Sequence, residues 1–142
     1  MTQKDKELLL KDLCARLPYG VKCENSNHVY GKNIFKVTDI RNNGYICGII
    51  NNQSYWAVFN PLELKPYLYP LSSMTEEQKK EYNRLKHEVP VCHYEYGDVV
   101  EEIELYDSPE SFEYLIENHF DYRGLIEKGL AIDATGLNIY YL

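Results

Sequence analysis

Apolar residues recur at every third or fourth position in the first part of the chain, over residues 2–17. This spacing is the period of an α-helix with one buried side, so we expect an N-terminal helix there. Pro18 and Gly20 follow and are typical of a helix end. Cys14 lies within the apolar stripe, which predicts a packed thiol and not a nucleophile. The stripe consists of Leu9, Leu10, Leu13, Cys14 and Leu17.

Residues 34–40 alternate between apolar and polar positions, which is the clearest β-strand signal in the chain. Asn43-Gly44 lies between two alternating runs and is typical of a type I′ hairpin turn. Both faces of the resulting strands are partly apolar, so both need a cover. We expect strands over residues 21–30 (two short ones joined through residues 24–27), 34–40, 45–50 and 55–59, with a turn at Asn51-Asn52.

Residues 65–85 join this strand-rich part to the rest of the chain. Pro66 and Pro70 alternate with apolar residues, and proline favours extended geometry in the residue before it. Residues 67–71 are therefore predicted to cross the open side of the sheet, opposite the N-terminal helix. The sheet is expected to be curved and antiparallel, with a barrel as one form that it can take.

Helix-start signals follow this crossing. Thr75 and Gln78 form a capping-box pattern, which predicts a helix that begins after Thr75 and reaches about Lys86. Ser108-Pro109 places proline at the first position of another helix. A second short C-terminal helix is expected over residues 122–128, capped by Asp121 and ended by Gly129.

Between the predicted helices, residues 89–96 and 99–105 alternate on either side of Gly97-Asp98, which predicts a hairpin. The apolar spacing of residues 99–105 also fits a helix. Residues 130–132 are interpreted as a last short strand, and the apolar residues 137–142 are expected to dock onto the fold. In the hairpin, Ile103 and Leu105 are expected to face inward, and Glu102 and Glu104 outward.

These elements predict an α+β protein with an N-terminal helix, a curved antiparallel sheet and a C-terminal pair of short helices. The 142 residues suit a single domain, residues 1–142, large enough to bury a core without disulfides or metal. Two parts of different texture are expected within it. Residues 18–71 form the β-rich part, and residues 72–142 the mixed helical part.

Charge is distributed unevenly along the chain, whose net charge is −7. Residues 1–64 hold eight Lys/Arg and six Asp/Glu, whereas residues 65–142 hold seven and sixteen. Eleven acids and no Lys or Arg occur between Glu88 and Asp121. Such a surface repels nucleic acids and anionic lipids, so we expect no direct nucleic-acid binding. It either solvates the protein, attracts a basic partner or imitates a nucleic acid.

The four cysteines lack the paired spacing of zinc sites and of redox motifs. The N-terminus has too short an apolar run for a signal peptide, and no apolar run has the length of a membrane span. We therefore expect a cytoplasmic protein with reduced thiols and no membrane association. Tyrosine is abundant, with 14 residues, which fits either packing beneath the surface or a protein interface.

Motifs for catalysis and cofactor binding are absent from the sequence. The four histidines have no metal-ligand spacing, no serine or cysteine lies in a nucleophile elbow, and no glycine-rich loop could hold a phosphate. We therefore predict no catalytic residue, no metal site and no cofactor. A site assembled from distant residues, such as Cys23, His28 and Cys47, stays open as an alternative.

The densest group of polar side chains is His119-Phe120-Asp121-Tyr122-Arg123. An imidazole, a carboxylate, a phenol and a guanidinium meet there at one predicted interhelical turn. They suit contact with an anion or a peptide, so His119, Asp121, Tyr122 and Arg123 are the candidate binding residues. The alternative is a structural turn, in which Asp121 caps a helix and Arg123 pairs with a nearby acid.

Two blocks of the sequence, KPYLYPLSSMTEEQKKEY and NHFDYRGLIEKGLAIDA, carry a resemblance to a known group. They resemble small proteins of Bacteroidales bacteria and of their phages and mobile elements, over about half of the chain. Tyr69 stands where that group often has arginine, and Asn118 where a second histidine is common. The group has no established activity, so the resemblance implies a phage or mobile-element setting and no mechanism.

Three functions are compatible with these observations. The first is a non-enzymatic accessory or interaction protein that acts through contacts with a protein partner. The second is an enzyme or a small-ligand-binding protein that uses the turn from His119 to Arg123. The third is an acidic nucleic-acid mimic that inhibits a DNA-binding partner, which requires the acids of residues 88–121 to gather on one exposed face.

Overall fold

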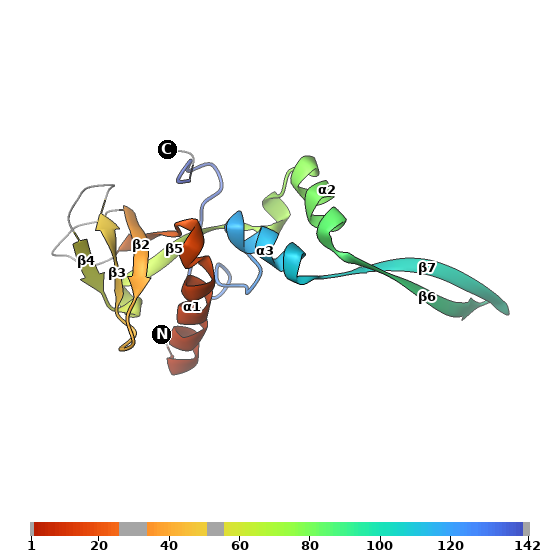
Figure 1. Cartoon of the computed structure of the whole chain (residues 1–142), viewed down its shortest axis with the longest axis horizontal. Helices are drawn as coiled ribbons and strands as arrows, with labels where there is room; N and C mark the ends of the chain where they lie inside the picture. Colours follow the sequence, from red (N-terminus) through yellow and green to blue (C-terminus); the bar gives the residue numbers. More distant parts are fainter. Residues whose placement is uncertain (1, 26–33, 51–55, 141–142) are drawn as a thin grey trace. The chain divides into compact units, whose positions relative to one another are not determined.

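The computed structural model describes residues 2–25, 34–50 and 56–140 (Figure 1). The chain divides into two compact units, and each is described by itself. The first consists of residues 1–73 and 116–142, and the second of residues 74–115. The second unit begins at Met74, two residues after the start of the part predicted to be mixed helical. The chain returns to the first unit at Ile116, within the part predicted to be mixed helical.

The first unit combines α1 with seven strands, and the second combines α2, a hairpin and α3, whose last two residues belong to the first unit. No helix in the described residues is long and apolar enough to span a membrane. The elements are α1 (Gln3–Arg16), β1 (Lys22–Asn25), β2 (Ile34–Ile40), β3 (Ile46–Ile50), β4 (Trp56–Phe59), β5 (Leu64–Pro70), α2 (Glu76–Leu85), β6 (His87–Glu95), β7 (Asp98–Tyr106), α3 (Pro109–Glu117), β8 (Phe120–Asp121) and β9 (Ile132–Asp133), with 3₁₀ turns at Leu17–Tyr19, Pro61–Glu63 and Leu71–Ser73.

The sheet of the first unit has the order β4-β3-β2-β1-β5-β8, and β9 also pairs with β5. The first five strands are antiparallel neighbours, whereas β8 and β9 run parallel to β5. The fold is therefore α+β, but the sheet formed by the described strands is not closed into a barrel. The predicted crossing is corrected as well: residues 64–70 form a strand inside the sheet.

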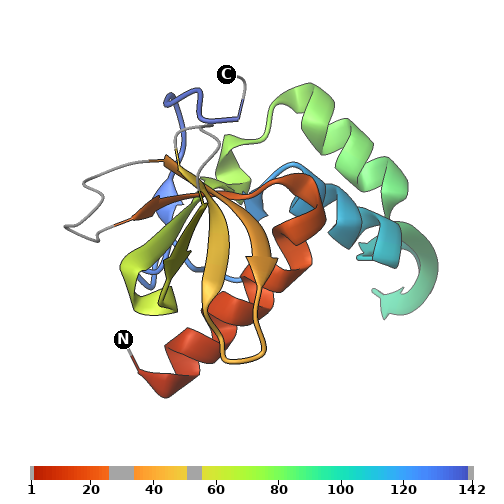
Figure 2. The ribbon, with the colours of Figure 1, turned by 60° about the vertical axis from the view of Figure 1, so that its left-hand side comes forward.

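Helix α1 lies across one face of the sheet (Figure 2). Thr2 caps it through a capping box with Asp5. Leu9 and Leu13 are fully buried, but Cys14 is exposed, so the prediction of a packed Cys14 thiol is wrong. The buried side of the helix differs from the predicted stripe and consists of positions 9, 12, 13 and 16. The core cluster contains Leu9, Leu13, Val21, Cys23, Phe35, Val37, Ile46, Ile50, Phe59 and Leu64.

The β2–β3 hairpin forms as predicted, but its turn differs. Only Gly44 has positive φ (83°), and its N–H donates to the Arg41 carbonyl, so Asn43-Gly44 is not a type I′ pair, which would need positive φ at both residues. Gly48 of β3 pairs with Val37 of β2, next to a register shift between Val37 and Asp39. A Cβ atom there would come within 2.0 Å of the Lys36 carbonyl oxygen. The second strand expected in residues 21–30 and the turn at Asn51-Asn52 lie outside the described residues.

The C-terminal part of the first unit packs against β5. The predicted short helix over residues 122–128 is absent, and residues 125–129 form consecutive turns. Gly124 and Gly129, both at φ 73°, introduce left-handed backbone, which does not continue an α-helix. The predicted strand near residue 132 is confirmed as β9, and the tail docks as expected as far as Tyr140, whose hydroxyl donates to the Tyr67 carbonyl at 2.7 Å.

The second unit begins with α2, and the capping box of Thr75 and Gln78 is confirmed. Strands β6 and β7 form the predicted hairpin, but its two-residue turn is Tyr96 (φ 54°) and Gly97 (φ 87°), one residue before the expected Gly97-Asp98. Positive φ at both residues matches a type I′ turn. The expectation that Ile103 and Leu105 face inward is wrong, because they are 67% and 42% exposed. We call β6 and β7 with their turn, residues 87–106, the ribbon.

Candidate functional site

The predicted binding residues lie where the chain enters β8. The His119 carbonyl accepts a hydrogen bond from the Tyr69 N–H at 2.8 Å, and Phe120 pairs with Tyr69 in the sheet. His119 adopts φ 61°, a left-handed conformation that costs a non-glycine residue about 1–2 kcal/mol. Backbone contacts with the sheet therefore hold the turn in place, and the four side chains extend from a fixed backbone.

The His119 side chain is buried, with 7% of its surface exposed. Its ring stacks on the Tyr140 ring at a centroid distance of 3.7 Å. Burial, and then the positive charges of Arg16 and Lys22, lower the pKa of His119 to about 4. The imidazole is therefore neutral near pH 7. Nδ1 of this ring has no hydrogen-bond partner in the described part of the chain.

Asp121 is 8% exposed and acts as a backbone cap. Its two carboxylate oxygens accept from the N–H groups of Leu125 and Ile126, at 3.0 and 2.9 Å. The predicted capping role is thus confirmed, although the capped segment is a series of turns and not a helix. A carboxylate that already accepts two backbone hydrogen bonds is a poor candidate for binding a ligand or carrying out general base catalysis.

Arg123 pairs with Asp12 of α1, whose carboxylate Oδ1 lies 3.2 Å from Arg123 Nε. The same carboxylate binds Arg16 Nε at 2.8 Å, and Arg16 also donates to the Phe120 carbonyl. Asp12 and Arg16 are fully buried, and Arg123 is 19% exposed. Two guanidinium groups thus share one carboxylate. The pair predicted for Arg123 exists, and its partner comes from the other end of the chain.

Tyr122 lies beside the two arginines. Its ring centroid is 4.7 Å from the Arg123 guanidinium carbon and 5.7 Å from that of Arg16. A cation over an aromatic face is attracted by the ring quadrupole. The structure therefore brings Tyr122 and Arg123 together, whereas the His119 side chain contacts Tyr140 and the Asp121 carboxylate contacts backbone N–H groups. All of these contacts are with the protein itself.

Sequence reasoning missed the residues that complete this cluster: Asp12, Arg16, Lys22 and Tyr140. One signal was present, because Asp12 and Arg16 are four residues apart and such pairs face each other on a helix. That spacing does not reveal burial, since most such pairs are solvent-exposed. Tyr140 is more than a hundred residues from Lys22, whose backbone N–H donates to the tyrosine hydroxyl at 3.0 Å, so no local pattern could have found it.

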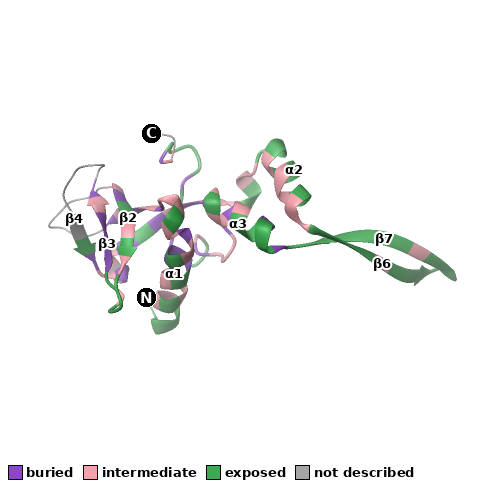
Figure 3. Ribbon diagram, viewed as in Figure 1, coloured by how far each residue is buried: buried purple, intermediate pink, exposed green. Residues whose placement is uncertain are grey.

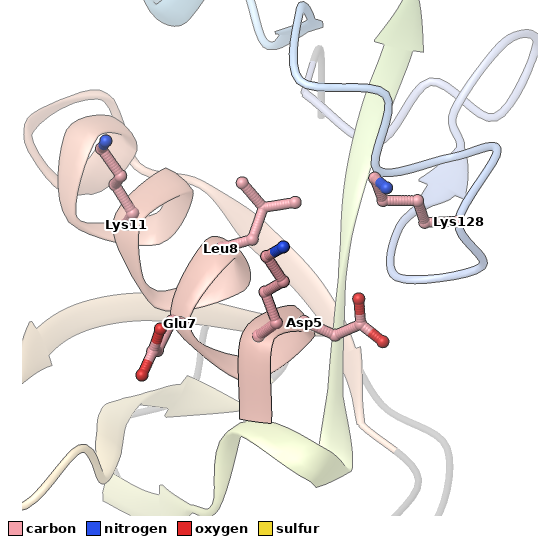
Figure 4. A pocket seen from close by; sticks show the side chains of 6 residues that line it. Asp5, Glu7, Leu8, Lys11 and Lys128 are labelled. Carbon is pink, nitrogen blue, oxygen red and sulfur yellow. The ribbon is translucent and has the colours of Figure 1, made fainter. Parts of the chain in front are cut away.

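Two hollows lie on the surface of the first unit. One, of about 390 Å³, is lined by Pro70, Leu71, Ser72, Asp121, Tyr122, Gly124, Ile126 and Glu127. The other, of about 360 Å³, lies between α1 and Lys128 (Figure 4) and is lined by Lys4, Asp5, Glu7, Leu8, Lys11 and Lys128. In the first hollow the Asp121 carboxylate already binds backbone N–H groups. Lysines and acids mix in the second hollow, so its lining does not favour a ligand of one charge.

Metal binding has no support in the described residues, which contain no group of three or more His, Cys, Asp or Glu side chains that could hold an ion. Cys23 and Cys47 are both buried, and burial raises the pKa of the Cys23 thiol far above its ordinary value. A protonated, buried thiol is a poor nucleophile and a poor metal ligand. His28, the third member of the alternative metal site, lies outside the described residues.

The second unit presents a different kind of surface, the ribbon. Nearly all of its residues are exposed, and only Val91 and Val100 are half-buried (Figure 3). Residues directly opposite each other in an antiparallel pair extend to the same face, so the strand register defines two faces. We call one of them the apolar face. It consists of Pro90, Cys92, Tyr94, Val99, Ile103 and Leu105, with Glu88 and Glu101 among them.

The opposite face of the ribbon is mixed. It carries valines and histidines together with four of the six ribbon acids: Glu95, Asp98, Glu102 and Glu104. The remaining acids of residues 88–121 lie on the apolar face, on or beside α3, and at the buried Asp121. The acids are therefore divided between several surfaces. This distribution is unfavourable for a nucleic-acid mimic, which needs them on one exposed face.

Comparisons of this chain with models of protein families, with curated proteins and with solved structures give no match. Its function must therefore be argued from the surfaces and contacts described above.

Proposed function

We propose that this protein is a non-enzymatic interaction protein that binds another protein through the apolar face of the ribbon. A phage or mobile-element setting, implied by the two resembling sequence blocks, stays a prediction. The observation that carries the proposal is the exposure of four large apolar side chains on one face: Tyr94 (82%), Ile103 (67%), Val99 (63%) and Leu105 (42%).

Physical reasoning supports a partner for this face. A two-stranded ribbon is marginally stable in water unless an apolar face is covered. Contiguous apolar patches on a protein surface commonly mark interaction sites. Tyrosine supplies a large, rigid contact area, and Tyr96 at the tip of the ribbon is 99% exposed. Folding of the described residues leaves this face uncovered, so its burial is available to a binding partner.

The turn from His119 to Arg123 is a weaker candidate for a binding surface than the ribbon. Its carboxylate, its guanidinium and its imidazole contact groups of the protein itself. A ligand at that turn would have to compete with buried ion pairs and stacked rings, which are costly to break. We therefore do not adopt it as the binding surface.

Matched double variants test the proposal. Val99→Thr/Ile103→Thr removes apolar surface from the apolar face but keeps β-branched side chains, which suit strands. Val89→Thr/Val91→Thr makes the same kind of change on the opposite face. Tagged proteins are used for affinity capture from host extracts, and captured proteins are quantified. We expect a protein that is retained by the wild type and the opposite-face variant and lost from the apolar-face variant. Equal capture by all three would refute the proposal.

A further inference from the structure

We infer that the partner is a basic polypeptide, one that presents alternating apolar and Lys/Arg side chains to the ribbon, and not a second copy of this chain. This inference deepens the proposed function and rests on it. It follows from the charges that surround the apolar face.

The ribbon has six carboxylates and no Lys or Arg over residues 87–106. Glu88 and Glu101 lie on the apolar face itself, directly opposite Leu105 and Cys92 in the register. Val99 and Ile103 therefore alternate with a negative charge on β7. A partner that covers this face must neutralise these carboxylates or leave them partly desolvated without a counterion, which is costly.

Contacts inside the ribbon leave these charges largely uncompensated. In the described residues of the ribbon, one contact between a nitrogen base and a carboxylate is seen: His93 Nε2 lies 3.7 Å from Glu95, on the opposite face. Glu104 accepts a hydrogen bond from the Tyr106 hydroxyl, and this bond raises the pKa of that hydroxyl. The two carboxylates on the apolar face have no Lys or Arg within the ribbon sequence to pair with, and both ribbon histidines lie on the opposite face.

A second copy fits this face poorly. Packed sheets lie about 10 Å apart, so two ribbons packed through their apolar faces would bring Glu88 and Glu101 of one copy close to the same carboxylates of the other. That distance is close to the screening length at physiological ionic strength, so the repulsion is only partly screened. A segment with Lys or Arg between its apolar residues buries the same surface and supplies the opposite charge.

Three synthetic peptides test the inference against the full-length chain. Each has ten residues and a fluorescent label: one alternates lysine and valine, one lysine and threonine, and one glutamate and valine. Binding is measured by fluorescence anisotropy. We expect the lysine–valine peptide to bind, the lysine–threonine peptide to bind roughly tenfold more weakly because it lacks apolar side chains, and the glutamate–valine peptide not to bind.

Two further arms complete this test. Raising the salt from about 50 to 300 mM should weaken binding of the lysine–valine peptide roughly fivefold or more, since salt screens opposite charges. Val99→Thr/Ile103→Thr should weaken it roughly tenfold, while Val89→Thr/Val91→Thr should change it less than about twofold. Equal binding of the two valine peptides, no binding of either, or a salt-independent affinity would overturn the inference.

Sedimentation of the protein without peptide tests whether a second copy of the chain binds the apolar face. We expect a monomer at both salt concentrations. A dimer that strengthens with salt and disappears in Val99→Thr/Ile103→Thr would overturn the basic-partner inference while leaving the apolar face as an interface. Host capture that depends on the apolar face, combined with failure of the lysine–valine peptide, would likewise refute the basic partner but not the proposed function. If host capture does not depend on this face, the proposed function fails.

Discussion

The two units of this protein differ in which kinds of side chain they bury and which they expose. In the first unit, ionisable groups are turned inward: Asp12 and Arg16 are fully buried, and His119 is nearly so. In the second, apolar groups are turned outward along the ribbon, where Ile103 is 67% exposed. Buried charges that find partners within the protein hold a structure together. Exposed apolar groups without a cover are available for contact with something else.

This difference changes which residues attract attention. The turn from His119 to Arg123 has the chemical variety expected of a binding site, yet its groups contact one another and α1. The ribbon has no unusual chemistry, yet its apolar face is exposed to solvent. In this molecule, whether a side chain already has contacts within the protein is therefore a better guide to function than the chemical variety of neighbouring side chains.

The most severe way to disturb the first unit is Asp12→Ala. Removal of this carboxylate leaves the buried Arg16 and the half-buried Arg123 without their shared counterion, and breaking such a pair costs about 3–5 kcal/mol. Glu81→Ala removes an exposed partner of Arg84 in α2 and serves as the control, for which we expect no measurable change. Urea unfolding measures both. Equal effects would mean that Asp12 is not buried with its arginines.

Acid should weaken the first unit through His119. An unfolded histidine titrates near pH 6.5, whereas the folded pKa is lowered to about 4. Below pH 6.5 the unfolded chain gains a proton that the native protein does not, so stability present above pH 6.5 is lost as the pH falls to 4. The loss is at most about 3–4 kcal/mol, since each pKa unit corresponds to about 1.36 kcal/mol.

Unfolding free energies measured from pH 7 to 4 check this expectation. His119→Asn removes the titrating group and keeps a residue that tolerates positive φ. This variant should lose much of the acid dependence, while the exposed His93→Asn should retain it. An unchanged pH profile in His119→Asn would contradict the assignment.

Gly48→Ala tests the close packing of the first unit's sheet. The added methyl group would meet the Lys36 carbonyl oxygen at 2.0 Å and Phe35 Cζ at 2.7 Å, so the strands must shift. Such overpacking costs about 2–3 kcal/mol. Gly136→Ala is the matched control, because its Cβ would meet no atom within 4 Å, although its φ of 79° is itself unfavourable for alanine by about 1 kcal/mol. Thermal unfolding that ranks Gly136→Ala as the more damaging would count against this prediction.

Loss of a helix cap should have a smaller effect, and one that is confined to the unit that holds the helix. Thr75→Ala removes the cap of α2, and Thr2→Ala removes the same type of cap from α1, each at a cost of about 1 kcal/mol. Hydrogen exchange resolved along the chain should show faster exchange in residues 74–115 for the first variant and in α1 for the second. Faster exchange throughout the chain in both variants would show that the units unfold together.

The smallest effect on stability is expected for the ribbon's apolar face. Val99→Thr/Ile103→Thr changes side chains that are 63% and 67% exposed, so the unfolding free energy should change by less than about 0.5 kcal/mol. The same variant is expected to lose its partner. A large destabilisation in denaturant unfolding would show that the face is already covered within the protein and would weaken the contrast between the units.

Local signals in the sequence predicted much of the fold. Thr75 with Gln78 identified the start of α2, and alternation identified the ribbon and the β2–β3 hairpin. These features depend on residues a few positions apart, so local physical chemistry determines them. Turn chemistry was less reliable. Asn43-Gly44 was expected to form the type I′ turn, but Tyr96-Gly97 has the positive φ values that this turn requires.

Features that depend on distant residues were not predictable in this way. Burial of Asp12 and Arg16 follows from their contacts with Arg123 and Phe120, which are more than a hundred residues away. Parallel pairing of β5 with β8 placed residues 64–70 inside the sheet instead of across it. The inward orientation expected for Ile103 assumed that every apolar residue of a strand finds a cover within the chain. Ile103, which is 67% exposed, does not meet that assumption.

Parallel pairing of Tyr69 with Phe120 also has a consequence for protein synthesis. The ribosome makes β5, then the 42 residues of the second unit (74–115), and only then β8 and Arg123. At about 5–20 residues per second, the nascent first unit waits roughly 2–8 seconds with one side of β5 unpaired and Asp12 and Arg16 without their distant partners. An unpaired strand edge invites pairing with other chains. Translation speed across codons 74–115 should therefore influence how much of the newly made protein aggregates.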